Sequence, residues 1–157
     1  DLAHSILKEL PPGYPYPTEE LWGQYYEGLG NYYLHISQAQ MAYDAFTHAQ
    51  GFVTEHAGWV NHLINLKARC LLNLRDYEQA LTILSPFIDG DSNIYSIHAV
   101  ELNLIRAECN WRIGNTEQAK QNLKSVEVMI SNLTDQPALE TYRSTLNELR
   151  TLLTNAI

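Results

Sequence analysis

The sequence holds few of the residues that cross-link or anchor a protein. It contains only two cysteines, Cys70 and Cys109, which are too few for a disulfide framework. It contains no apolar run near the ~18 residues that a membrane-spanning helix needs. We therefore expect no membrane span. Lys and Arg number 10 against 18 Asp and Glu, and the formal net charge is −8. Because nucleic-acid backbones and anionic lipid surfaces attract basic faces, we also expect no nucleic-acid partner and no binding to an anionic membrane surface.

Motifs that carry chemistry are also missing. His56 and His62 are six residues apart, which places them on different faces of a helix. The sequence has no H-E-x-x-H motif and no Cys-x-x-Cys motif. The segment Gly28-Leu29-Gly30 lacks the third glycine and the preceding strand of a phosphate-binding loop. We therefore predict a protein that is not an enzyme, with no metal site and no cofactor.

The residues that are present favour one all-α domain. The chain of 157 residues is 45% hydrophobic and 18% charged, the balance of a globular protein. Apolar residues recur at helical spacing, and no segment shows the alternation of a strand. The predicted helices span residues 2–10, 19–35, 38–55, 58–74, 77–88, 94–113, 116–132 and 136–155. The chain starts at Asp1 without a signal peptide, so we expect a piece of a larger protein, cytoplasmic rather than periplasmic.

Short polar turns separate the predicted helices. Thr18 precedes Glu19 and Glu20 and can cap the helix that they begin. Three later turns carry a polar cap residue followed three positions later by Gln, which predicts a capping box in each. These pairs are Ser37 with Gln40, Asp76 with Gln79, and Asn115 with Gln118.

An internal repeat organises most of the chain. Residues 63–84 align with residues 102–123 at an offset of 39, and residues 25–46 join the alignment at an offset of 38. Small residues recur at two matched positions and large apolar residues at others, which is the signature of stacked helical hairpins. The small residues are Gly30, Ala68 and Ala107, and then Ala42, Ala80 and Ala119; a large residue follows at Phe46, Leu84 and Leu123.

The first repeat resembles the tetratricopeptide consensus. Tyr26-x-x-Leu29-Gly30-x-x-Tyr33 is followed by Ala42-x-x-x-Phe46-x-x-Ala49, with Tyr26 where the family usually has Trp. The resemblance implies a right-handed superhelix of antiparallel helix hairpins. The repeats are longer than the usual 34 residues, as in large bacterial regulators and sensor proteins, and Lys67 and Arg106 replace Leu29. We expect an N-terminal helix and Pro-rich linker over 1–17, three hairpins over 18–134, and a capping helix over 135–157.

The repeat also bears on the two thiols. Cys70 and Cys109 occupy equivalent positions of successive repeats, and equivalent side chains point in the same direction rather than at each other. A disulfide needs Cα atoms within about 7 Å and facing Cβ vectors. We therefore predict two buried free thiols that serve as small apolar fillers.

In proteins of the tetratricopeptide family, the first helix of each hairpin lines a concave groove that holds ligands. By repeat position, the resemblance places there Gln24, Glu27, Asn31, His62, Asn65, Arg69, Asn73, Glu101, Leu104, Glu108 and Arg112. Glu27 and Glu101 stand where a carboxylate clamp would have lysines, which disfavours binding of a terminal carboxylate. Two alternatives stay open: the helix faces are merely solvated, or Tyr14, Tyr16 and Trp22 form the contact surface.

The resemblance implies a protein partner or peptide partner. The leading hypothesis is an interaction or sensory domain of a larger bacterial regulatory protein. One alternative is a small acidic chaperone similar to the tetratricopeptide chaperones of type III secretion translocators. The other is a scaffold in which an exposed hairpin end pairs with a second copy as a homo-oligomer.

Overall fold

The described part of the chain is built entirely of helices. The computed structural model describes residues 18–55, 57–87, 97–133 and 139–155, and no strand occurs among them. The helix predicted over 2–10 lies outside these residues. The helices are α2 (Glu19–His35), α3 (Ala39–Phe52), α4 (Ala57–Asn73), α5 (Tyr77–Leu84), the short 3₁₀ helix η1 (Ser85–Phe87), α6 (Ile97–Arg112), α7 (Thr116–Asn132) and α8 (Leu139–Asn155).

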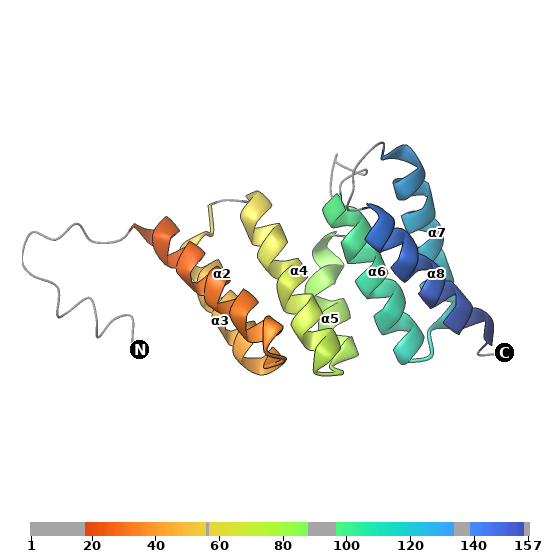
Figure 1. Ribbon diagram of the computed structural model, residues 1–157, viewed down its shortest axis with the longest axis horizontal. Coiled ribbons are helices and arrows are strands. Elements are labelled where there is room, and N and C mark those ends of the chain that lie inside the picture. Colours follow the sequence, from red (N-terminus) through yellow and green to blue (C-terminus); the bar gives the residue numbers. More distant parts are fainter. Residues whose placement is uncertain (1–17, 56, 88–96, 134–138, 156–157) are drawn as a thin grey trace, which may run out of the picture.

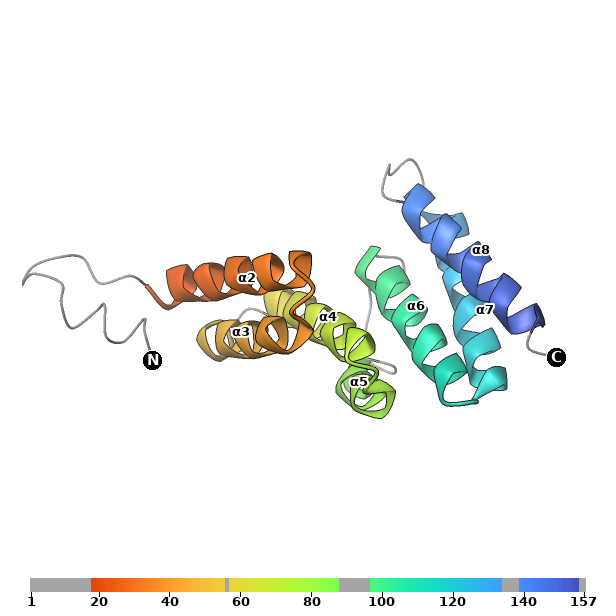
Figure 2. The ribbon, with the colours of Figure 1, turned by 60° about the horizontal axis from the view of Figure 1, so that its bottom comes forward.

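The helices pair as antiparallel hairpins in a row (Figure 1). The pairs are α2 with α3, α4 with α5, and α6 with α7, and α8 packs on the last pair. The first helices α2, α4 and α6 lie together with α8 on one side of the row, and the second helices lie behind them; Figure 2 shows the row from another side. We call the surface formed by α2, α4, α6 and α8 the first-helix face. The fold is all-α and tetratricopeptide-like, as the sequence predicts.

The matched small residues lie where the two helices of a hairpin approach each other. Ala42, Ala80 and Ala119 are fully buried in the three second helices. A Cβ atom on Gly30 would lie 2.5 Å from the ring of Phe46, so the α2–α3 contact leaves no room for a side chain there. The helix spacing of the first hairpin therefore depends on glycine.

The turn inside each hairpin uses the same backbone device. Ser37, Arg75 and Gly114 occupy equivalent positions, and each has a positive φ, of 60°, 62° and 84°. In each turn this residue donates to the carbonyl three residues back, and the next residue donates to the carbonyl five back, as in Ser37 N to Leu34 O (3.0 Å) and Gln38 N to Tyr33 O (2.8 Å). This is a Schellman motif, which satisfies carbonyls at the helix end.

The geometry corrects the three predicted capping boxes: two lack a side-chain cap, and the third has the cap without its return bond. Ser37 ends the first helix of its hairpin, and the N-cap of α3 is Gln38, which makes no side-chain cap. Asn115 is the N-cap of α7 without a side-chain cap, and its amide nitrogen donates to Asn110 Oδ1 at 3.4 Å. Asp76 does cap α5, since its Oδ1 accepts from the Gln79 N–H at 3.2 Å. Its own N–H donates to the Leu71 carbonyl at 2.9 Å rather than to the Gln79 side chain, so this box is only half formed. Thr18 caps α2 through the Leu21 N–H, as predicted.

Cations on the first helices tie successive hairpins together. Lys67 Nζ donates to Gln50 Oε1 near the end of α3 at 3.1 Å. The equivalent Arg106 is buried and donates to the carbonyl of Leu84, the last residue of α5. The carbonyls at a helix end lack partners within the helix, so Arg106 satisfies one of them at the end of α5. Leu29 holds this position in α2.

Both cysteines are free and fully buried, as predicted. Burial raises the pKa of each thiol from 9.0 to about 12. Because the thiolate is the reactive form, these side chains act as apolar fillers at neutral pH.

Candidate functional site

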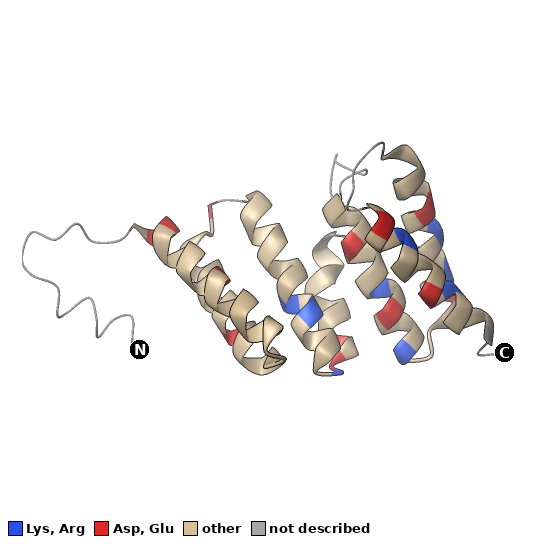
Figure 3. Ribbon diagram, viewed as in Figure 1, with Lys and Arg blue, Asp and Glu red and all other residues tan. Residues whose placement is uncertain are grey.

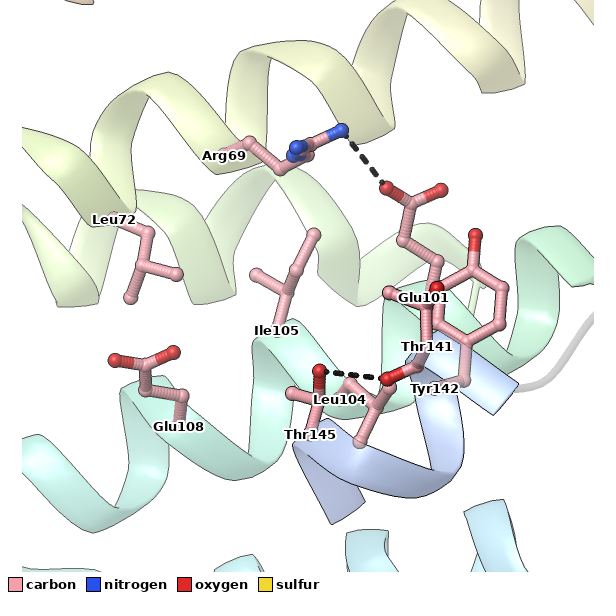
Figure 4. A pocket seen from close by; sticks show the side chains of 9 residues that line it. All are labelled: Arg69, Leu72, Glu101, Leu104, Ile105, Glu108, Thr141, Tyr142 and Thr145. Atoms are coloured by element: carbon pink, nitrogen blue, oxygen red, sulfur yellow. Dashed lines mark hydrogen bonds and ion pairs between the residues drawn. The ribbon is translucent and has the colours of Figure 1, made fainter. Parts of the chain in front are cut away.

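The first-helix face carries a pocket where α4, α6 and α8 meet (Figure 4). Its volume is about 410 Å³. The apolar part of the lining is formed by Leu72, Leu104 and Ile105. The polar part is formed by Arg69 from α4, Glu101 and Glu108 from α6, and Thr141, Tyr142 and Thr145 from α8. An apolar floor with convergent polar groups is typical of a ligand site.

An ion pair closes one side of this pocket. Arg69 Nη1 lies 3.3 Å from Glu101 Oε1 and so links α4 to α6. Tyr142 lies next to this pair in Figure 4. Burial raises the pKa of the Tyr142 hydroxyl, the nearby Glu101 carboxylate raises it further, and Arg69 opposes both effects. Tyr142 is therefore a neutral hydroxyl at physiological pH.

A second ion pair lies at the other side of the pocket. Arg112 Nη2 lies 3.2 Å from Glu108 Oε1, one helical turn away, and its guanidinium lies 4.5 Å from the centre of the Trp111 ring. The pocket thus contains both signs of charge, and both of its carboxylates have a guanidinium within ion-pair distance. An apolar group can enter it without leaving a charge unpaired.

The other end of the first-helix face is held by a different cluster. Glu27 of α2 accepts from Trp59 Nε1 and lies 3.3 Å from His62 Nε2, both on α4. The His62 ring lies 5.7 Å from the ring of His98 on α6. Side-chain contacts on the first-helix face therefore connect α2 to α4 and α4 to α6.

The predicted groove residues fall into four groups. Arg69, Glu101, Leu104 and Glu108 line the pocket, and Arg112 lies beside it. Glu27 and His62 meet in the cluster at the other end. Gln24, Asn31 and Asn73 are exposed on their helices. Asn65 is 2% exposed and donates to the His98 carbonyl at 3.5 Å, so its amide links α4 to α6 rather than facing solvent.

Sequence reasoning missed the contribution of α8. Thr141, Tyr142 and Thr145 form the third wall of the pocket, whereas α8 was expected only to cap the stack. Carrying the offset of 39 once more aligns Leu146 with Ala107, and both are buried. That alignment places α8 where the first helix of a fourth repeat would lie, and it could have indicated a lining role.

Trp22, near the start of α2, packs inside the first hairpin. The Trp22 ring lies 6.5 Å from Phe52 and 6.3 Å from Tyr26. Tyr14 and Tyr16, the other candidates for an aromatic contact surface, lie outside the described residues. Trp22 therefore contributes to the α2–α3 core.

Charge is distributed unevenly along the row. Residues 9–66 contain no Lys or Arg, and Figure 3 shows basic residues only from α4 onward.

Within the residues that the structure describes, no three His, Cys, Asp or Glu side chains gather as a metal-ion site. None of the helices in the described ranges combines the length and apolar character needed to cross a bilayer.

Compared by sequence, the chain matches no protein-family model and no curated protein. Among solved structures it is similar to the NMR structure of the first TPR (tetratricopeptide repeat) domain of the human RPAP3 protein. The TM-score is 0.58 at 14% sequence identity, over 87% of this chain and 98% of that chain. The similarity extends along almost the whole neighbour and establishes the tetratricopeptide-type fold.

Proposed function

Proceeding from this fold, we propose that the chain is a protein-interaction module that holds a segment of a partner protein on its first-helix face. The pocket between α4, α6 and α8 is the anchor point. Its volume of about 410 Å³ lies within the range of about 300–1,000 Å³ that is typical of ligand sites. The pocket is the single observation that carries the proposal.

The chemistry of the pocket favours an apolar side chain of the partner. Arg69 pairs with Glu101, and Arg112 pairs with Glu108. Both guanidinium groups are thus already engaged, which disfavours a partner that would present a carboxylate to this pocket. The hydroxyl groups of Tyr142, Thr141 and Thr145 can form hydrogen bonds with the backbone amides and carbonyls of the partner. An extended or helical segment with one apolar anchor fits this arrangement.

The test is a selection of peptides from a random library against the intact chain. We expect the selected peptides to share an apolar anchor. Thr145→Trp fills the pocket from its half-buried rim and should weaken their binding at least about tenfold, an effect of about 1.4 kcal/mol. Ser144→Trp places the same side chain on an exposed neighbouring position of α8 and should leave binding unchanged.

Equal binding of the peptides to Thr145→Trp and to the unaltered chain would refute the pocket as anchor. Measuring peptide binding to Arg69→Ala and to Glu108→Ala extends the test to the two sides of the pocket. Asn65 is unsuitable for this purpose, because it is buried and its replacement would change stability.

The biological setting is a second part of the proposal. We place the chain in a larger bacterial regulatory protein, because the long-period repeats it resembles occur in such proteins. A reading frame that encodes a DNA-binding, kinase or cyclase domain beside this segment would support that setting. A frame that ends near Ile157 and begins near Asp1 would favour the small chaperone instead.

A further inference from the structure

One face of α2 is open where the corresponding faces of α4 and α6 are covered. In α4, this face is packed against the first hairpin and belongs to its core cluster. In α6, it is packed against the second hairpin. The covered residues are Leu63, Leu66 and Cys70 in α4, and Leu102, Ile105 and Cys109 in α6. Their equivalents in α2 are Tyr25, Gly28 and Tyr32, and the two tyrosines are 51% and 57% exposed.

The exposed side chains of this face extend along the whole helix. Leu21, Tyr25, Gly28, Tyr32 and Ile36 follow each other at intervals of three or four residues and are all exposed. Residues at this spacing share one side of a helix. We call these five residues the α2 stripe.

The order of side chains in the α2 stripe is nearly symmetric about its centre. From a midpoint between Gly28 and Leu29, Tyr25 and Tyr32 are equally distant on either side, and so are Leu21 and Ile36. An antiparallel second copy would place tyrosine against tyrosine and leucine against isoleucine. A two-fold interface requires such a self-complementary patch. A Cβ atom on Gly28 would meet no atom within 4 Å, so two helices can approach closely at the centre.

The charges on α2 are also compatible with a second copy in this register. The carboxylates of α2 are Glu19, Glu20 and Glu27, and none of them belongs to the stripe. In the antiparallel register they oppose Gln38, Ser37 and Gly30 of the second copy, so no like charges meet. The stripe itself is uncharged and has no group that would select an acidic or a basic partner.

We propose that two copies of this chain associate through the α2 stripe as an antiparallel, two-fold symmetric pair. A single helix pair buries less than the ~800 Å² per partner of a standard stable interface, so the association is weak and depends on concentration. Added salt strengthens it, because each copy carries a net charge of −8 and salt screens their repulsion.

Sedimentation of the 157-residue chain at increasing concentration tests the association. We expect the average mass to rise towards that of a dimer, and Tyr32→Glu to raise the dissociation constant at least about tenfold. Met41→Glu is the matched control, because Met41 is an exposed apolar residue of α3 outside the stripe. A chain that stays monomeric at every concentration, or a Tyr32→Glu variant that dimerises normally, would overturn the proposal.

Cysteine cross-linking tests the antiparallel register. The native thiols are buried and should not react. Gly28→Cys lies next to the two-fold axis and should form a disulfide-linked dimer on its own. Two copies of Tyr32→Cys lie about 10 Å apart along the helix axis, beyond disulfide reach, so this variant should cross-link only when mixed with Tyr25→Cys.

Two results would contradict this arrangement. Efficient Tyr32→Cys homodimers without Gly28→Cys homodimers would indicate a different register. Dimerisation of a chain that lacks residues 1–17, but not of the full chain, would show that the chain's own N-terminal segment covers the stripe. Neither experiment involves the pocket, so their failure leaves the peptide-binding proposal untouched.

Discussion

The first and third hairpins share the same antiparallel pairing and the same turn, and they differ in interior chemistry. The first is packed by aromatic rings, with Tyr26 stacked on Phe52 at 5.8 Å between ring centres and Phe46 pressed on Gly30. The interior of the third hairpin contains buried side-chain amides, and Asn110 of α6 donates to Asn122 Oδ1 of α7 at 3.2 Å. The shared features are a small residue at the close approach and a left-handed residue in the turn. A helical hairpin therefore tolerates different cores as long as these backbone requirements are met.

The largest expected effect concerns the close approach in the first hairpin. Gly30→Ala should destabilise the protein by about 1–3 kcal/mol, because its Cβ would lie 2.5 Å from the Phe46 ring. Gly51→Ala is the control, since its Cβ would meet no atom within 4 Å, and it should not destabilise. Urea unfolding measures both.

The same comparison provides a rescue. Adding Phe46→Leu to Gly30→Ala recreates the Ala and Leu pair of the second and third repeats. We expect the double variant to be more stable than the sum of the two single effects predicts. Strict additivity would mean that the two positions do not contact each other as described.

The amide network of the third hairpin gives the next effect. Asn122→Ala should cost about 1–3 kcal/mol, because it leaves the buried Asn110 amide without its acceptor. Asn110→Leu with Asn122→Ile copies Leu71 and Ile83 of the second repeat and should recover most of the loss. The exposed Asn147 of α8 is the control, and its change to Ala should shift thermal unfolding little. A double variant less stable than Asn122→Ala would argue that the network has no apolar substitute.

The turns give a smaller effect of opposite sign. Ser37→Gly and Arg75→Gly should each stabilise by up to about 1 kcal/mol, because glycine bears a positive φ without a Cβ clash. Gly114→Ala should destabilise by a similar amount. Ser125→Gly, in the interior of α7, should lower the midpoint of denaturant unfolding. Destabilisation by Ser37→Gly would contradict the turn assignment.

Thiol labelling at neutral pH sharpens the comparison without changing stability. Tyr32 is the equivalent of Cys70 and Cys109, and it differs from them in being 57% exposed. Tyr32→Cys should therefore react readily with a thiol reagent in the folded protein, while the two native thiols react only after denaturation. Rapid labelling of Cys70 or Cys109 would show that the packing interfaces between successive hairpins open in the folded protein.

The two buried thiols contribute a pH dependence of stability only in alkali. In the unfolded chain, both native thiols ionise near pH 9, whereas burial raises their pKa to about 12 in the folded protein. The folded state therefore holds more protons between these values, and stability falls as the pH rises from about 9 to about 12. Replacing both cysteines with alanine should flatten this decline, as measured by unfolding at several pH values.

Much of the architecture could be predicted from the sequence, because the repeat places the same residue types at the same structural positions. Gly30 and Phe46 are in contact, and Cys70 and Cys109 are both buried, as the alignment indicates. The errors lie where several residue types serve equally well. Ser37 has the chemistry of an N-cap, but tertiary packing places it in the left-handed turn position, which Arg75 also occupies.

The pocket was harder to predict than the fold. Arg69, Glu101, Leu104 and Glu108 follow from the repeat positions, because the first helix of each hairpin lies on one face. Asn65 follows the same rule, yet it is buried because α6 packs over it. Tyr142 was missed because α8 was treated only as a cap, although carrying the offset of 39 into α8 aligns Tyr142 with Asn103 of α6.

The sequence by itself determined the stack of hairpins, the buried thiols and the acidic character, since these depend on composition and on a repeated pattern of small and large residues. Only the tertiary structure decided that α8 completes a pocket with α4 and α6, and that the α2 stripe stays open while its equivalents are covered. The physical reason is that local patterns specify which faces of a helix are apolar. Which neighbour covers each face depends on how the hairpins follow one another in space.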